Sequence, residues 1–325
     1  MTLRRPGADG ERAASAADAV LVSGSAHPDL ARAVASWAGI ELAPTAVERF
    51  PDGEIHVELQ TDVRGRAAYV LQPTFAPVGE HVLELVLLAD ALRRAGALQV
   101  AAVLPYFGYS RQERRVRPGE PLGARVIADL LERGRFARFF AVELHAPAVE
   151  GFFETPLEHL SAVPVLAEVA RKRVGRDAVI VSPDLGGANL AREYARKLGL
   201  PVAVVQKSRR SGSEVAVHEV VGDVSGRTPL VVDDMIATGG TIAAAAEALR
   251  ARGARDPVVV VATHALLAGS AVEVLERARV AALVATDTVP PRDGGAFARE
   301  VVSVAPLLAQ AIRRDATSTV LGARG

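Results

Sequence analysis

The most informative segment of the chain is Leu230-Val231-Val232-Asp233-Asp234-Met235-Ile236-Ala237-Thr238-Gly239-Gly240-Thr241-Ile242. Its apolar, β-branched beginning predicts a buried strand over Pro229–Val232, which delivers two acidic residues at its carboxyl end. A short Thr-Gly-Gly-Thr loop follows and opens a predicted helix over Thr241–Ala251. A strand, a glycine-rich turn and a helix in this order are typical of a parallel α/β sheet.

The loop over residues 237–241 has the chemistry of a phosphate site. A helix N-terminus offers unpaired backbone N–H groups and a partial positive charge. Glycine lets the backbone approach an anion, and the two threonine hydroxyls add donors. Asp233 and Asp234 would repel a phosphate, so they suit sugar hydroxyls or a bound Mg²⁺. The segment therefore fits a sugar phosphate, the alternative being an ordinary capped helix beside two surface acids.

The alternation of strands and helices runs through the rest of the chain. Apolar, β-branched runs predict further strands at Ala19–Val22, Ala67–Leu71, Gln99–Leu104, Phe139–Val142, Ala178–Val181, Val202–Val205 and Val258–Ala262. Amphipathic stretches predict helices at Pro28–Ala38, Glu80–Ala95, Gly123–Arg133, Val163–Val174 and Ala188–Leu198. A break near Leu160–Pro164 leaves an alternating half on each side, as 325 residues suggest for two domains. The predicted fold class is α/β, with mostly parallel sheets flanked by helices.

One early segment predicts a hairpin instead. Thr45–Phe50 and Glu54–Leu59 are joined by Pro51-Asp52-Gly53. Proline fixes its own φ and glycine permits a positive φ, so this tripeptide favours a tight turn between two short strands.

Composition narrows the function classes. Lys+Arg and Asp+Glu are both 38, so a globally basic, nucleic-acid-binding surface is excluded and any anion must be bound by local clusters. The chain has no cysteine, which excludes disulfides, zinc–thiolate sites and a cysteine nucleophile. The first 17 residues lack the apolar core of a signal peptide, and no apolar run is long enough for a membrane span. We expect a cytoplasmic protein.

Polar clusters follow several other predicted strands. A cluster of four arginines and one glutamine lies just past a predicted strand; it comprises Arg111, Gln112, Arg114, Arg115 and Arg117. Guanidinium groups bind phosphate oxygens in pairs and stack on flat rings, and glutamine can hydrogen-bond a base edge. The alternative for this segment is a solvated basic loop.

Three more segments have a possible functional role, and each also has a purely structural alternative. His145 is a candidate metal ligand or general base, or a structural histidine. Asp184, before Gly186 and Gly187, is a candidate Mg²⁺ ligand or caps its own turn. The Gln206–Ser213 segment, with Lys207 and Arg209, is a cationic loop over a transferring phosphoryl group or a polar hairpin tip.

In order and spacing these segments resemble ribose-phosphate pyrophosphokinase (PRPP synthetase), a family with the type I phosphoribosyltransferase fold. The resemblance rests on Phe50–Glu54, Pro105–Pro121, Leu144–Pro147 with Gly151–Phe153, Ser182–Gly187, Lys207–Arg209 and Val232–Thr241, and covers about Ala19 to Arg313. Simple phosphoribosyltransferases would share only the last of these segments, so the earlier ones make the match specific.

The resemblance implies an activity and an organisation. ATP and ribose 5-phosphate would give AMP and 5-phosphoribosyl 1-pyrophosphate with Mg²⁺, in a homo-oligomer, often a hexamer built from dimers. Residues 1–18 would form a flexible arm, 19–160 an ATP-contacting domain and 161–325 a similar domain that binds ribose 5-phosphate and PRPP. The final residues would pack back on the N-terminal domain. No nucleic acid or membrane partner is implied.

The resemblance also assigns roles by matching position. Adenine, reached from a neighbouring subunit, would contact Phe50, Asp52, Gly53 and Glu54, and ATP would be held by Arg111 and Gln112. The ribose hydroxyls would meet Asp233 and Asp234, and the 5-phosphate would lie in the loop Ala237, Thr238, Gly239, Gly240 and Thr241. Mg²⁺ would lie at His145 and Asp184, and the catalytic cations would be Lys207 and Arg209.

The sequence departs from the family pattern at several of these positions. Ala237 replaces the usual aspartate, so backbone donors remain but a carboxylate is lost. Glu143 and Glu113 are each one methylene longer than the usual aspartate, and Arg115 replaces lysine. These changes put allosteric control by ADP and phosphate in doubt.

Three other functions share part of this sequence pattern. A non-catalytic, synthetase-like regulatory subunit would lack the loop cations, but Lys207 and Arg209 are both present. A salvage phosphoribosyltransferase is favoured by Ala237 but not by the ATP-type segments of the N-terminal half. A PRPP-sensing DNA-binding regulator would need a basic recognition helix, and none is recognisable.

Overall fold

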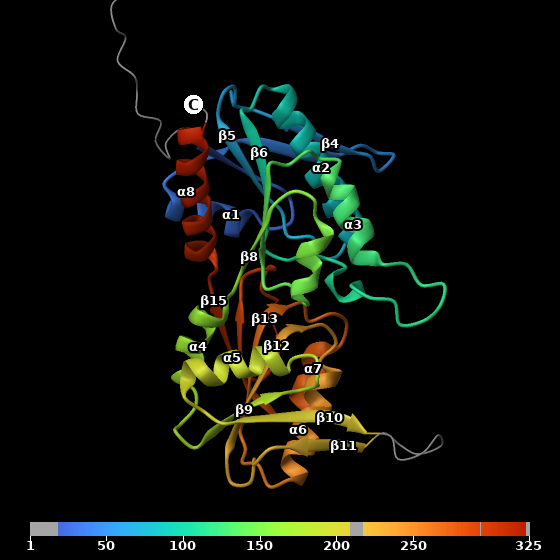
Figure 1. Ribbon diagram of the computed structural model, residues 1–325, viewed down its shortest axis with the longest axis vertical. Helices are drawn as coiled ribbons and strands as arrows, with labels where there is room; N and C mark the ends of the chain where they lie inside the picture. Colours follow the sequence, from blue (N-terminus) through green and yellow to red (C-terminus); the bar gives the residue numbers. More distant parts are fainter. Residues whose placement is uncertain (1–18, 209–216, 293, 323–325) are drawn as a thin grey trace, which may run out of the picture.

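The structure is a computed structural model that describes residues 19–208, 217–292 and 294–322. Two α/β units follow one another along the long axis of the molecule, each a sheet covered by helices (Figure 1). The predicted N-terminal arm, residues 1–18, lies outside the described residues. In the described part of the chain, no helix has both the length and the apolar character needed to cross a bilayer.

The N-terminal unit is a six-stranded parallel sheet of order β2-β1-β5-β6-β7-β8. Its strands are β1 (Ala19–Ser23), β2 (Glu41–Ala43), β5 (Ala67–Leu71), β6 (Gln99–Leu104), β7 (Arg138–Val142) and β8 (Leu157–Leu160). Alternate side chains point to opposite faces, so Tyr69 and Leu71 join the cluster under α1 (Pro28–Ala38). Ala68 and Val70 face α2 (Val78–Arg94) and α3 (Gly123–Glu132). Both faces are covered, which is why these strands are almost entirely apolar.

The C-terminal unit is a seven-stranded sheet of order β11-β10-β9-β12-β13-β14-β15, parallel except for the β10–β11 pair. Its strands are β9 (Ala178–Ser182), β10 (Val202–Ser208), β11 (Val217–Val221), β12 (Thr228–Ile236), β13 (Val258–Ala265), β14 (Val280–Thr286) and β15 (Ala298–Val302). Its helices are α4 (Val163–Arg171) and α5 (Ala188–Leu198) on one face, and α6 (Gly240–Ala251) and α7 (Ala271–Arg277) on the other. The mostly parallel α/β prediction is confirmed.

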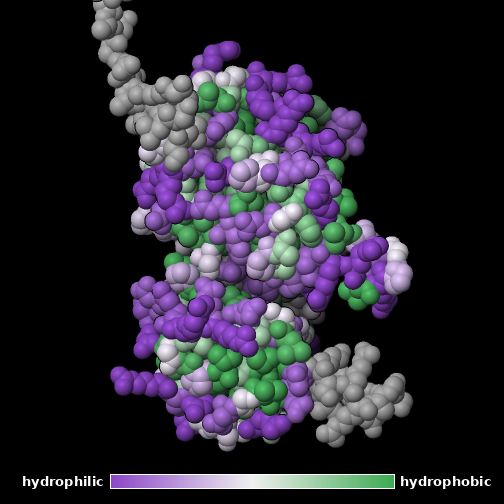
Figure 2. All heavy atoms as spheres, in the orientation of Figure 1, coloured by the Kyte–Doolittle hydropathy of each residue, from purple (hydrophilic) through white to green (hydrophobic). Residues whose placement is uncertain are grey.

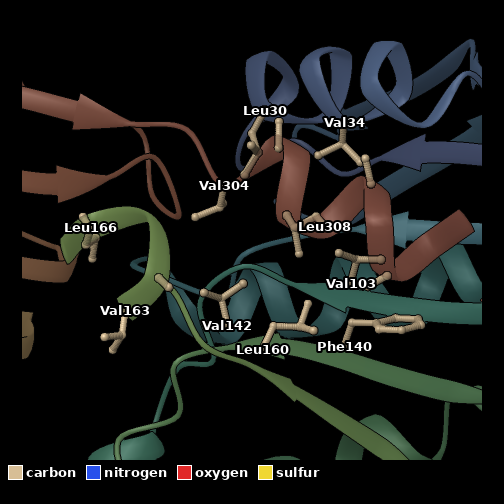
Figure 3. Packing of buried hydrophobic residues seen from close by; sticks show 14 of the residues in the cluster. Leu30, Val34, Val103, Phe140, Val142, Leu160, Val163, Leu166, Val304 and Leu308 are labelled. Carbon is tan, nitrogen blue, oxygen red and sulfur yellow. The ribbon is translucent and has the colours of Figure 1, made fainter. Parts of the chain in front are cut away.

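The last helix, α8 (Ala305–Gly322), returns from the C-terminal sheet to the N-terminal unit and packs against α1 (Figure 1). Figure 3 shows Leu308 of α8 between Val34 of α1 and Val103 of β6. The buried carboxylate of Asp315 accepts a 2.8 Å hydrogen bond from the Tyr69 hydroxyl and pairs with Arg138 at 3.0 Å. A single hydrophobic cluster therefore extends over both units.

The predicted hairpin is confirmed. β3 (Thr45–Arg49) and β4 (Ile55–Leu59) form a separate antiparallel pair that contacts α2, where Arg49 forms an ion pair with Glu80. At the turn Gly53 has φ +93°, and the Asp52 carboxylate accepts a hydrogen bond from the backbone N–H of Glu54. Proline, aspartate and glycine thus each serve the turn in the way their chemistry predicts.

One predicted boundary near the phosphate loop is wrong. The strand predicted to stop at Val232 continues to Ile236, because β12 pairs in parallel with β13 up to the Ile236–Ala265 register. Asp233 and Asp234 therefore lie inside the second half of a strand rather than after it. Successive side chains of a strand point to opposite faces, so the two carboxylates leave the backbone in different directions.

Candidate active site

The candidate site lies at the carboxyl edge of the C-terminal sheet, where it meets the N-terminal unit. Because β9 and β12 are parallel, the loop after β9 with Asp184 and the end of β12 with Asp233 and Asp234 lie at the same edge of the sheet. These acids and residues 235–239, 241 and 242 line a small cavity of about 90 Å³ together with Arg111 and His145 of the N-terminal unit. A larger cavity of about 850 Å³ shares the same acids and His145. Residues predicted from both halves therefore meet at one place.

The predicted phosphate loop is an open helix N-terminus. Helix α6 begins at Gly240, and Gly239 before it has the left-handed φ of +77° with no side chain capping the helix. A Cβ at Gly239 would lie 3.2 Å from the carbonyl oxygen of Ala271, so a larger residue fits poorly there. The carbonyl of Ala237 accepts a 2.8 Å hydrogen bond from the N–H of Ala268, which fixes the start of the loop. The first N–H groups of α6 are left for an anion, even though Ala237 brings no carboxylate.

The carboxyl groups of Asp233 and Asp234, the acid pair, have shifted pKa values. Burial and the nearby Asp234 carboxylate raise the pKa of Asp233 to about 8. Burial would also raise the pKa of Asp234, but the hydrogen bond and charge of His145 outweigh it and lower that pKa. The two carboxylates therefore differ in charge near neutral pH unless a cation joins them.

His145 connects the two units across the site. Its Nδ1 donates a 2.8 Å hydrogen bond to Oδ2 of Asp234, and this bond raises the pKa of His145 against the effect of burial. The imidazole is about one third exposed, whereas the Asp234 side chain is 14% exposed. Because Nδ1 is used in this pair, Nε2 is the ring nitrogen left for a ligand of the site.

Asp184 caps its own turn, as one of its two predicted alternatives has it, and its role as a Mg²⁺ ligand stays a prediction. Its Oδ1 accepts a 3.0 Å hydrogen bond from the N–H of Gly187, and its carbonyl accepts one from the Ser182 hydroxyl. The residue nevertheless lines both cavities. It caps its own turn and at the same time presents a carboxylate to the site.

The residues present suit Mg²⁺ held jointly by protein and substrate. Among the described residues, no group of three or more histidine, cysteine, aspartate or glutamate side chains is arranged as a preformed metal cage. Mg²⁺ commonly keeps water and substrate phosphate oxygens and takes one or two protein carboxylates. Asp184 lines the cavity with the Asp233–Asp234 pair, whose mutual repulsion a divalent cation would relieve. The donor set therefore fits this ion.

The arginine segment divides between the cavities and the solvent. All four arginines are exposed, but Arg111 lines the small cavity and Arg114 the large one, whereas Arg115 and Arg117 line neither. This loop projects from the middle of the molecule (Figure 1). Gln112 lines neither cavity; its side chain packs against Gly123 at the start of α3.

The other predicted site residues lie away from the cavities or outside the described residues. Phe50, Asp52, Gly53 and Glu54 lie at the tip of the β3–β4 hairpin, and none of them lines either cavity of its own chain. Phe50 is 48% exposed. The backbone of Lys207 is in β10, opposite His218, and Arg209 lies outside the described residues.

Several residues of the larger cavity were not predicted from the sequence. They are His159, Asn189, Arg192, Glu193 and Arg196. Arg192 and Arg196 are four residues apart in α5, so they lie on one helix face. Helix α5 starts directly after the Asp184 turn. The spacing of its two arginines was therefore a sequence signal that could have predicted a basic helix face beside Asp184. The surface shown in Figure 2 is mostly polar around the junction of the two units.

A parallel α/β sheet with an acid pair and an open Thr-Gly-Gly-Thr loop defines the phosphoribosyltransferase class, and a family model described as the phosphoribosyl transferase domain matches residues 159–286. A second model, the N-terminal domain of ribose phosphate pyrophosphokinase, matches residues 19–134. The chain belongs to the ribose-phosphate pyrophosphokinase family.

Individual relatives agree with this over nearly the whole chain. A ribose-phosphate pyrophosphokinase of Wolinella succinogenes is 40% identical over 294 residues, which are 90% of this chain and 94% of that protein. One of Streptomyces coelicolor is 43% identical over 295 residues, 90% of this chain and 91% of that protein. The crystal structure of phosphoribosylpyrophosphate synthetase from Mycobacterium smegmatis matches with a TM-score of 0.85 and 38% identity, over 91% of this chain and 98% of that one.

Proposed function

We propose that the chain transfers the β,γ-pyrophosphoryl group of ATP to the C1 hydroxyl of ribose 5-phosphate, giving PRPP and AMP. The observation that carries the proposal is the small cavity, where Arg111 and His145 of one unit meet the acid pair and phosphate loop of the other. A triphosphate and a sugar phosphate can be brought together only where both units contribute. The N-terminal domain, residues 19–160, would present ATP, and the C-terminal domain, residues 161–325, would hold the sugar.

The sugar phosphate takes its orientation from the loop and the acids. The 5-phosphate accepts hydrogen bonds from the N–H groups at the start of α6 and from the Thr238 and Thr241 hydroxyls. Asp233 and Asp234 accept hydrogen bonds from the ribose hydroxyls. With the phosphate fixed at one end and the hydroxyls at the other, the C1 oxygen faces the N-terminal unit.

The transfer itself is a displacement at the β-phosphorus of ATP. The C1 oxygen forms a bond to that phosphorus and loses its proton, and the bond to the α–β bridging oxygen breaks, so AMP leaves with the electron pair. Arg111 and the pair Lys207 and Arg209 would stabilise the negative charge that develops on the bridging and equatorial oxygens. Asp184 and His145 would hold Mg²⁺, which would supply further positive charge to the transferring group.

The adenine site would be completed by a second copy of the chain. The hairpin tip with Phe50, Asp52 and Glu54 is remote from the cavities of its own chain, and Phe50 offers an exposed ring for stacking. We therefore propose a homo-oligomer, with dimers as its unit, in which each tip serves a neighbour. A cytoplasmic location, where ATP and ribose 5-phosphate are available, is part of this proposal.

Product analysis tests the proposed reaction. The protein is incubated with ATP, ribose 5-phosphate and Mg²⁺, and AMP and PRPP are quantified. We expect both products in equal amounts, and we expect Lys207→Ala to lower kcat at least ~100-fold, the scale of one lost transition-state cation. Lys172→Ala, an exposed lysine at the end of α4, is the matched control and should keep the parent rate.

Two results would contradict the proposal. Nucleotide binding without turnover would indicate a regulatory subunit. Pyrophosphate release that requires PRPP and a free purine or pyrimidine base would indicate a salvage phosphoribosyltransferase.

A further inference from the structure

The two units also meet through a buried polar junction beside the site, which the reaction described above does not use. Glu143, directly after β7, is 8% exposed, and His264 of β13 is 1% exposed. His264 lies opposite Met235 in the β12–β13 register, next to Asp234. A 3.0 Å hydrogen bond joins Nε2 of His264 to the carbonyl oxygen of Glu143. The junction therefore lies two residues from His145 on one side and one strand from Asp234 on the other.

The hydrogen-bond partners fix the tautomer of His264. A carbonyl oxygen only accepts, so Nε2 carries the proton and donates it to Glu143. Burial lowers the pKa of His264, so the ring is neutral and Nδ1 is an acceptor. The Thr288 hydroxyl, 2.8 Å away, donates to Nδ1, while the Thr286 hydroxyl donates to the carbonyl of Thr263 at 2.6 Å. The Thr286 and Thr288 hydroxyls also lie within 3.0 Å of each other, so His264 is held by a connected buried network.

The Glu143 backbone needs such support. Its φ is +41°, in the left-handed region that a residue with a Cβ rarely adopts, so its conformation must be imposed by its surroundings. The Glu143 carboxylate accepts hydrogen bonds from the N–H of Ala162 at 2.9 Å and the hydroxyl of Ser161 at 3.2 Å, at the start of α4. Val142, Leu160 and Val163, which flank these residues in the sequence, belong to the hydrophobic cluster that extends over both units, and Figure 3 shows Val142 beside Leu160.

The loop from Glu143 to His145 is thus attached to the C-terminal unit at two points. His264 of β13 binds the Glu143 carbonyl, and Asp234 of β12 binds the His145 ring. We propose that His264 is a positioning residue, whose Nε2–H holds the Glu143 carbonyl and thereby sets His145 against Asp234 at the mouth of the phosphate loop. The part of this inference that concerns turnover rests on the proposed function, whereas the part that concerns the loop does not.

Two substitutions separate hydrogen bonding from packing. His264→Leu fills a similar volume but removes the donor, whereas His264→Gln keeps an amide N–H that can reach the Glu143 carbonyl. Thr263→Val is the matched control, because it removes a buried hydroxyl on the same strand that has no hydrogen-bond partner. Thr288→Val removes the donor to Nδ1 and frees the ring to take the other tautomer.

The kinetic readout is the split between kcat and KM. In His264→Leu we expect kcat to fall on the order of 100-fold, the scale of an ångström-size misplacement of a site residue. KM for ribose 5-phosphate should change little, because the phosphate loop belongs to the C-terminal unit. His264→Gln should recover most of kcat, Thr288→Val should be intermediate, and Thr263→Val should equal the parent.

Hydrogen exchange gives a readout that does not need turnover. Peptides covering residues 143–147 should exchange faster in His264→Leu than in the parent and should be protected again in His264→Gln. If the parent makes no PRPP, the proposed function fails but these exchange rates still decide the positioning role. Unchanged exchange and kcat in folded His264→Leu would overturn the inference. So would a folded His264→Gln whose kcat falls on the order of 100-fold below that of the parent, whether or not the leucine variant folds.

Discussion

At the residue scale, Gly239 shows how a backbone conformation and a ligand site depend on each other. Its left-handed φ of +77° and the 3.2 Å approach to Ala271 leave little room for a Cβ. We expect Gly239→Ala to lower the free energy of unfolding by about 1 kcal/mol or more and to weaken ribose 5-phosphate binding, because the α6 N–H groups turn away from the anion. Calorimetric titration with ribose 5-phosphate and thermal unfolding measure the two effects.

Gly199→Ala is the control for this prediction. Gly199 also has a positive φ, +66°, at the end of α5, but no atom lies near its missing Cβ. It should lose stability in the same way and keep its affinity for ribose 5-phosphate. Unimpaired binding in Gly239→Ala would show that the loop does not depend on this conformation.

His264 gives a second prediction at this scale, in the dependence of stability on pH. Burial lowers its folded-state pKa below the unfolded value of 6.5, partly opposed by the Glu143 carbonyl and the Asp234 charge. The unfolded chain therefore binds a proton first as the pH falls, so the contribution of His264 is complete above pH 6.5 and is lost below it.

The measurement is the unfolding temperature of the parent and of His264→Gln, which does not titrate, at about pH 7.5 and about pH 5.5. We expect the parent to lose more stability between the two pH values, by at most about 1.4 kcal/mol for each unit below the unfolded pKa. Thr263→Val should follow the parent. Equal losses in the parent and His264→Gln would contradict a neutral, buried His264.

The sequence predicted several residues that line the small cavity, but it did not predict which side chains they would contact. The acid pair, the phosphate loop and His145 were predicted from local patterns, since each depends on residue types next to each other. That His145 would pair with Asp234, 89 positions away, follows only from the packing of the two units. His264 gave no signal, because its partners Glu143 and Thr288 are distant in the sequence and its own neighbours are an ordinary apolar strand.

At the element scale, local end signals decided which boundaries could be predicted. Helices α1 and α5 were predicted with the bounds they have, and each is followed by a glycine in the left-handed conformation. The end of β12 was predicted wrongly, because aspartates are depleted in strands. Here the pairing of β12 with β13 overrides that preference. The three-residue β2 carries too short a pattern to predict, and it forms because it adds to the edge of an existing sheet.

Besides its apolar packing against α1, helix α8 carries a mostly buried polar anchor. Asp315 is 11% exposed in its side chain and binds both Tyr69 and Arg138 of the N-terminal unit. We expect Asp315→Ala to lower the free energy of unfolding by about 1–3 kcal/mol, because a buried hydroxyl and a guanidinium lose their acceptor. Urea unfolding followed by circular dichroism measures the change.

Asp129→Ala is the matched comparison, since Asp129 pairs with Arg125 on the exposed surface of α3. Exposed pairs contribute little, so this variant should change stability by less than about 0.5 kcal/mol. Equal effects of the two substitutions would mean that α8 is not held by Asp315.

At the scale of the whole molecule, the two units form one body, and the tip of the β3–β4 hairpin lies outside the site between them. A hydrophobic cluster, the return of α8 and the His145–Asp234 pair join the units within the chain. The β3–β4 hairpin contacts α2 through its strands, whereas its tip lines neither cavity. The hairpin's own residues do not predict this separation, because packing sets the position of a hairpin relative to the sheets; only the family resemblance implied that the tip serves a neighbouring subunit.

Subunit mixing tests whether the tip serves a neighbour. Phe50→Ala and Lys207→Ala are each expected to be nearly inactive, the first in adenine binding and the second in the transfer step. In a mixed oligomer, a Phe50→Ala subunit keeps its cations and can receive an intact tip from a Lys207→Ala neighbour. With equal amounts and random exchange, about one quarter of the sites should combine both intact parts, so the mixture should regain about one quarter of the parent rate.

If each tip served its own chain, no site in the mixture would be complete, and the rate would stay at the sum of the two variants. Mixing parent with Lys207→Ala is the control for exchange, and light scattering establishes that mixed oligomers have the same mass as the parent.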